Sequence, residues 1–98
     1  MRGVNLVTIS GNVTADINFA SLPGGEDAVS FMIVSDRRSE GVKVSAKVKI
    51  NVYIEQLIGI CKPRLVRGIY VIVVGELMNR DGNHGKLTEV RAREIIFL

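Results

Sequence analysis

The sequence predicts an all-β fold with one short helix, arranged as a five-stranded Greek-key barrel. Three observations support this prediction: β-rich segments separated by turn residues, one long segment of strict apolar and polar alternation, and a single helix-like segment after it. A chain of 98 residues is long enough for one domain with a real core and too short for two. We therefore expect a single domain over residues 1–98.

The first two strands flank a connection that is rich in turn residues. Residues 4–10 are largely apolar and β-branched, and Gly11 and Asn12 are predicted to end this strand. Residues 23–25, Pro-Gly-Gly, mark a turn, and residues 28–35 supply the second strand. The chain is thus expected to begin as a meander with a moderately long first connection.

The third strand has the clearest pattern, because residues 42–54 alternate strictly between apolar and other side chains. Every even position in this range is apolar. The odd positions are occupied by Lys43, Ser45, Lys47, Lys49, Asn51 and Tyr53. Successive side chains of a strand point to opposite faces, so we expect the even set in the core and the odd set on an exposed face.

The single helix is predicted for residues 55–66, where the alternation stops. Four apolar residues have helix-like spacing in this segment: Leu57, Ile58, Cys61 and Leu65. Gly59 weakens the segment, and Pro63 cannot occupy a helix interior without a kink. We expect a short or broken helix that ends before Gly68.

Two strands and their hairpin follow the helix. Residues 69–74 form a β-branched run that Gly75 is expected to close, and residues 87–97 supply the last strand. Residues 76–90 are therefore predicted to form a hairpin around a turn at residues 80–85. The order of three strands, one helix and two strands is that of a five-stranded Greek-key barrel of the OB-fold type.

Composition and charge narrow the class of protein. The chain has 13 Lys and Arg against 10 Asp and Glu, a net charge of +3, which favours an anionic partner. Cys61 is the only cysteine and His84 the only histidine, so neither a disulfide nor a zinc site is expected. No apolar run reaches the ~18 residues of a membrane span, and no signal-peptide core precedes the first strand. We expect a cytoplasmic protein without membrane contact, metal or other cofactor.

Four short segments, in the correct order and spacing, give the chain a family resemblance. They are Arg2–Val7 with Gly11, Asn12 and Asp16; Ala28–Ile33 with Arg37; Arg67, Gly68, Val71 and Gly75–Leu77; and Thr88–Ala92 with Ile95–Leu98. Together they cover most of the chain and resemble the bacterial single-stranded-DNA-binding protein family. This resemblance implies a non-catalytic OB-fold protein that assembles as a homo-oligomer, a tetramer or a dimer. It further implies that the protein coats single-stranded DNA in replication, recombination or repair, associates with the nucleoid, and has replication or repair proteins as candidate partners.

The chain departs from this family in two respects. It contains no tryptophan and only Tyr53 and Tyr70 beside three phenylalanines. Fewer aromatic side chains are therefore expected to stack on bases than in the family. The sequence also stops at Leu98, so the acidic tail through which the family recruits partners either lies outside the given sequence or is lacking, as in a tail-less relative. The primosomal replication proteins, which share the fold and are also short and tail-less, are therefore the closest alternative.

The third strand carries the main candidates for DNA binding. Its odd positions place three lysines, an asparagine and a tyrosine in one row, with alternate residues about 6 to 7 Å apart, close to the phosphate spacing of an extended strand. Two loops that could close over DNA add four candidates: Arg37 and Arg38 before this strand, and Arg80 and Lys86 on the last hairpin. The full predicted set is Arg37, Arg38, Lys43, Lys47, Lys49, Asn51, Tyr53, Arg80 and Lys86. The alternative is that these residues only solvate a strand face and two loops.

The fourth strand is apolar on both faces. Val71 and Val73 share one face, which can pack in the barrel, while Tyr70, Ile72 and Val74 share the other. We predict that the second face is an oligomer interface. The alternative is that the helix or a loop of the same chain covers it.

Catalysis is not expected, because the sequence shows no nucleophile with a base, no paired acids and no phosphate-binding loop. Two functions from different classes remain. The first is single-stranded DNA binding with little sequence preference, which the lysine row supports. The second is a primosomal or protein-interaction module with weak or no DNA binding, which the scarcity of aromatic residues supports.

Overall fold

The computed structural model describes residues 3–25, 27–82 and 85–98. Within these ranges it contains six strands and one helix, which agree with the predicted order except for an added short strand in the first connection. The elements are β1 (Val7–Val13), β2 (Asn18–Ser21), β3 (Asp27–Ser39), β4 (Val42–Val52), α1 (Glu55–Arg64), β5 (Tyr70–Gly82) and β6 (Gly85–Phe97).

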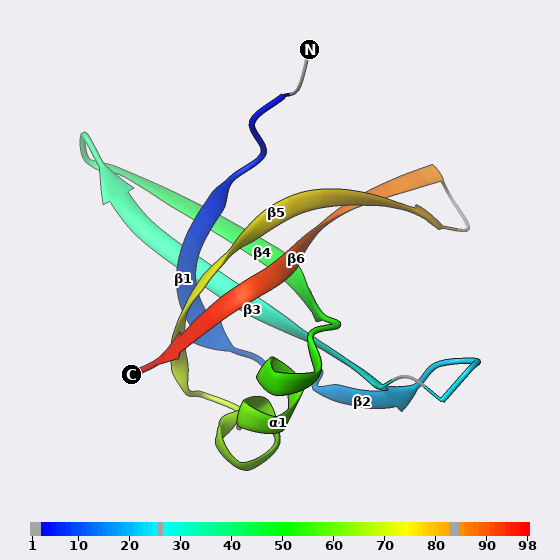
Figure 1. The fold of residues 1–98 in the computed structure, drawn as a ribbon. Coiled ribbons are helices and arrows are strands. Elements are labelled where there is room, and N and C mark those ends of the chain that lie inside the picture. The colour runs from blue at the N-terminus through cyan, green and yellow to red at the C-terminus, as the bar shows by residue number, and fades with distance from the viewer. Residues whose placement is uncertain (1–2, 26, 83–84) are drawn as a thin grey trace.

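The five long strands close into a barrel. Hydrogen-bonded neighbours follow the order β1, β5, β6, β4 and β3, and β1 pairs again with β3 to close the ring. All these pairs are antiparallel except β4 with β6, which run parallel at Ile50 and Val90. The short β2 pairs with β3 outside the ring, and α1 lies at one end of the barrel (Figure 1). This arrangement confirms the predicted OB-fold.

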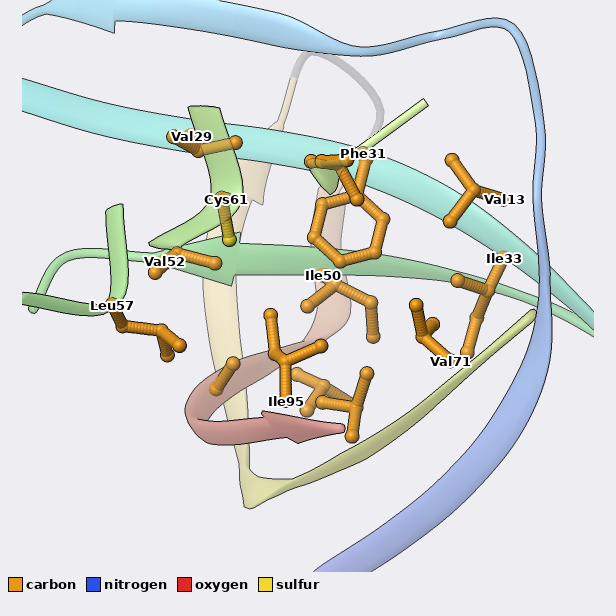
Figure 2. Packing of buried hydrophobic residues seen from close by; sticks show 14 of the residues in the cluster. Val13, Val29, Phe31, Ile33, Ile50, Val52, Leu57, Cys61, Val71 and Ile95 are labelled. Carbon is orange, nitrogen blue, oxygen red and sulfur yellow. The ribbon is translucent and has the colours of Figure 1, made fainter. Parts of the chain in front are cut away.

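The core forms from the inward-facing residues of every long strand. Val29, Phe31 and Ile33 alternate along β3, and Ile50 and Val52 face them from β4, all five fully buried. The helix closes the end of the barrel with its buried residues Leu57, Ile58 and Cys61, of which Figure 2 labels Leu57 and Cys61. Such burial is the main stabilising term of a small domain.

Cys61 is completely buried in this core. Desolvation raises the pKa of its thiol from 9.0 to about 11. The thiol therefore stays protonated at neutral pH and acts as an apolar filler, as the sequence predicts.

The prediction that the even positions of residues 42–54 all face the core is wrong for the first half of this range and for Ile54, which follows the end of β4 and is exposed. Val42 and Val44 are 62% and 49% exposed. Past Val34 the two strands β3 and β4 pair only with each other, through a turn at Glu40 and Gly41 where φ is positive. This extension, residues 35–47, is called the β3–β4 arm; it projects from the barrel (Figure 1), so neither face meets a core.

Two predicted strand boundaries are also wrong. β1 continues through Gly11 and Asn12, and β5 continues through Gly75. Both glycines are needed for close backbone approach instead. A Cβ at Gly11 would overlap the Val34 carbonyl where β1 closes on β3, and a Cβ at Gly75 would overlap the Arg91 carbonyl. The β5–β6 ladder shifts register at Gly75, as a β-bulge requires.

Candidate nucleic-acid interface

The odd residues of β4 lie on its outward face, opposite the core. We call Lys43, Lys47, Lys49, Asn51 and Tyr53 the β4 row; Tyr53 directly follows the strand. Residues paired across a ladder share a face, and Arg38 of β3 is paired with Lys43. Arg38 therefore joins the β4 row at the arm, and the face runs from the arm onto the barrel.

Arg37 and Arg38 differ in where they point, although both were predicted to open a loop. They belong to β3, not to a loop, because β3 extends to Ser39. Arg37 pairs with Val44, on the arm face opposite the β4 row. The structure therefore brings Arg38 to the candidate interface and places Arg37 on the other side.

The arm carries the cations that are free to meet an anion. Arg38, Lys43 and Lys47 are exposed, and none forms a salt bridge with another residue in the part of the chain that the structure describes. These three cations outnumber Asp36, the carboxylate that its pairing with Ser45 places on the same face of the arm. An excess of positive charge on one strand face gives salt-dependent binding of a polyanion.

The centre of the face is organised around a buried carboxylate, Glu89 of β6, which is 3% exposed. Its oxygens accept hydrogen bonds from Asn51 Nδ2 at 2.8 Å and from an Arg80 guanidinium nitrogen at 3.1 Å. Lys49 Nζ lies 3.8 Å from the same carboxylate. Since Asn51, Arg80 and Glu89 come from β4, β5 and β6, the cluster ties three strands together.

This cluster corrects the expectation that Asn51 is exposed. Its side chain is 5% exposed, because β6 lies beside β4 at this point and Glu89 covers the amide. Lys49 is 30% exposed and Arg80 49%, so both reach solvent while their charges are balanced in part by Glu89. Sequence reasoning did not find the role of Glu89, since nothing local predicts a parallel β4–β6 contact.

The row ends at an aromatic and arginine pair. The Arg91 guanidinium lies over the Tyr53 ring, with 5.4 Å between its central carbon and the ring centroid. Arg91 is opposite Asn51 in the parallel ladder, which is why it reaches this face. Such a pair offers planar surfaces for base stacking, and Arg91 was missed by the sequence analysis.

The remaining predicted DNA-binding residue is Lys86. It lies in β6, opposite Asp81 of β5, and its side chain is outside the described part of the structure. His84, in the predicted turn between these strands, is also outside the described residues.

A second outward face lies on β1, β5 and β6. Val71 and Val73 are buried, as predicted, and Tyr70, Ile72 and Val74 face outward. Tyr70 is 41% exposed and hydrogen bonds through its hydroxyl with Ser10 Oγ at 2.9 Å. Ile96 of β6 lies opposite Ile72 and is 42% exposed, so an apolar surface stays open beside β5.

A closed OB barrel with cations and an aromatic and arginine pair along one outward strand face defines a nucleic-acid-binding OB-fold protein. The sequence model of the single-strand binding protein family matches residues 4–98, and the chain belongs to this family. It is accordingly a non-catalytic protein that binds single-stranded DNA.

Comparison with solved structures supports the fold. The chain is similar to the Plasmodium falciparum SSB in its complex with ssDNA, with a TM-score of 0.85 and 22% sequence identity. The match covers 100% of this chain and 97% of the other. No significantly similar sequence was found among curated proteins. Among the described residues, α1 is the one helix, and its ten residues are too short to span a membrane.

Proposed function

We propose that single-stranded DNA lies along the β4 row. Its phosphates contact the arm, and its bases stack at the other end of the row. Arg38, Lys43 and Lys47 contact phosphates, and Tyr53 with Arg91 provides the stacking surface. The observation that carries this proposal is that the unpaired cations of the arm and the stacking pair share one strand face. Lys49 adds a charge that Glu89 offsets in part.

Sequence preference along this row is small, because phosphate contacts carry no base information. The protein then coats and protects unpaired DNA in replication, recombination or repair. It works in the cytoplasm at the nucleoid, where replication or repair proteins are its candidate partners.

We further propose that the apolar surface of Tyr70, Ile72 and Val74 is the contact between copies of the chain in a dimer or tetramer. Tyr70 and Ile96 are each about two-fifths exposed, and apolar surface of this kind is favourably buried by a second subunit. This surface lies on β1, β5 and β6, apart from the arm, so assembly leaves the β4 row open to DNA.

Two observations favour the alternative function, a primosomal or protein-interaction module with weak or no DNA binding. Two of the predicted cations, Lys49 and Arg80, contact Glu89, and the face carries a single aromatic side chain of the β4 row. Such a module would keep the apolar surface and bind oligonucleotides weakly at any salt concentration.

The neighbours Arg37 and Arg38 provide the test. Arg38→Glu should weaken binding of a labelled oligo-dT about tenfold at low salt. It should also make the slope of log K against log salt concentration shallower by about 0.7 for each phosphate contact removed. Arg37→Glu changes the net charge equally on the opposite face and is the matched control. Equal losses for the two variants would place DNA elsewhere than on the β4 row.

A further inference from the structure

A groove of about 680 Å³ opens beside the end of the β4 row. Tyr53 and Arg91 form one part of its wall, and α1 contributes Glu55, Ile58 and Lys62. Asp27, the first residue of β3, also lines the groove. The volume lies in the range of sites that hold small organic ligands, so one nucleotide base fits within it.

The groove is continuous with the proposed DNA face, because Tyr53 and Arg91 belong to both. A strand that follows the β4 row past Asn51 arrives at this opening. Bases of single-stranded nucleic acid can be splayed out and held on aromatic rings or guanidinium planes.

The charges of the groove suit a base better than a phosphate. Arg91 and Lys62 are balanced by Glu55 and Asp27, so the lining has no net positive charge. Asp27 accepts a hydrogen bond from Ser21 Oγ at 3.3 Å and lies 4.0 Å from Lys62 Nζ, whereas Glu55 is exposed in the first turn of α1. Both carboxylates line the groove together with Tyr53 and Arg91, so they border the space that a base stacked on this pair would occupy.

Carboxylates accept hydrogen bonds and recognise the exocyclic amino group of a base, as in the contact of Asp or Glu with cytosine N4. Thymine has no amino group, and its one donor, N3–H, lies between two carbonyl oxygens that a carboxylate repels. We propose that this groove is a base-reading pocket that prefers a base with an exocyclic amino group over thymine, through Glu55 and Asp27. This inference rests on the proposed DNA face and adds a base preference that phosphate contacts do not give.

The test compares oligo-dC with oligo-dT of equal length in the wild type and in the double variant Glu55→Gln with Asp27→Asn. Removing two negative charges strengthens binding of both oligonucleotides, so the informative quantity is the ratio of their Kd values. We expect the affinity for oligo-dC relative to oligo-dT to fall about tenfold in the double variant, the size of effect that one hydrogen-bonded base edge provides. Asp16→Asn, an exposed site that does not line the groove, is the control and should leave the ratio unchanged.

The outcomes separate this inference from the proposed function. If the double variant shifts both Kd values equally, the carboxylates do not read the base and the inference is wrong, while the DNA face stands. If the wild type binds neither oligonucleotide even at low salt, both the proposed function and the pocket are wrong.

Discussion

Glu89 is a carboxylate in the middle of a surface that we propose for DNA, which is unfavourable unless cations neutralise it. Lys49 and Arg80 provide that neutralisation, at 3.8 Å and 3.1 Å. The three side chains together leave one net positive charge. The free positive charge of the interface therefore lies on the arm, at Arg38, Lys43 and Lys47.

The same residue yields a stability prediction. Glu89→Ala leaves the buried Asn51 amide without its acceptor, which costs about 1 to 3 kcal/mol, beyond any cost of the cavity. Glu89→Gln keeps an acceptor for Asn51 and loses mainly the ion pairs to two partly exposed cations, which contribute little. In urea unfolding, Glu89→Ala should therefore show a lower free energy of unfolding than Glu89→Gln. Equal free energies of unfolding would show that the Asn51 bond does not stabilise the fold.

At this scale the sequence predicted which side chains share a face but not how deeply each is buried. Alternation placed Lys49, Asn51 and Tyr53 together, and the structure agrees. The burial of Asn51 and the contact of Arg91 with Tyr53 depend on the parallel pairing of β4 with β6. That pairing joins segments about 40 residues apart, so no local pattern could reveal it.

The five long strands and the helix were predictable in number and order, because the turn residues and the period-two pattern are local signals, whereas the short β2 was not predicted. Their lengths were not, since glycines inside strands resemble strand ends in sequence. Gly11 and Gly75 were interpreted from the sequence as strand ends, whereas each permits a close approach between strands. The β3–β4 arm was missed because its alternation continues where the core has ended.

The glycines give a prediction at the scale of the element. Gly75→Ala forces a Cβ into the Arg91 carbonyl at the β-bulge, and overpacking of this kind costs about 1 to 3 kcal/mol or more. Gly59→Ala, inside α1 with nothing within 4 Å of the added Cβ, should stabilise the protein by about 0.5 to 1 kcal/mol. In thermal unfolding, the Tm should therefore fall below the wild-type value for Gly75→Ala and rise above it for Gly59→Ala. A Gly75→Ala protein as stable as the wild type would exclude the backbone overlap.

On the scale of the whole molecule, the barrel separates two surfaces. The β4 row with Arg38 belongs to the sector of β3 and β4, and the apolar surface belongs to the sector of β1, β5 and β6. The sequence predicted both surfaces from alternation alone. It could not predict their separation, because that depends on how the ring closes between β1 and β3.

The apolar surface gives a prediction for assembly. Tyr70→Lys places a charge on the proposed contact between copies without disturbing the core, since the side chain is 41% exposed. Light scattering should show a smaller mass than for the wild type. Val44→Lys changes another exposed apolar residue, 49% exposed on the β3–β4 arm, and should leave the mass unaltered. A wild-type mass for Tyr70→Lys would remove this face from the interface.

The central claim is that a basic strand face of this OB barrel binds single-stranded DNA through phosphates. Fluorescence anisotropy of labelled oligo-dT, titrated with the protein at several salt concentrations, tests it most directly. With roughly three to four phosphate contacts, from Arg38, Lys43, Lys47 and in part Lys49, log K should fall with log salt at a slope of about 0.7 per contact. No binding at low salt, or binding that salt does not weaken, would contradict the claim and leave the barrel as an assembly module.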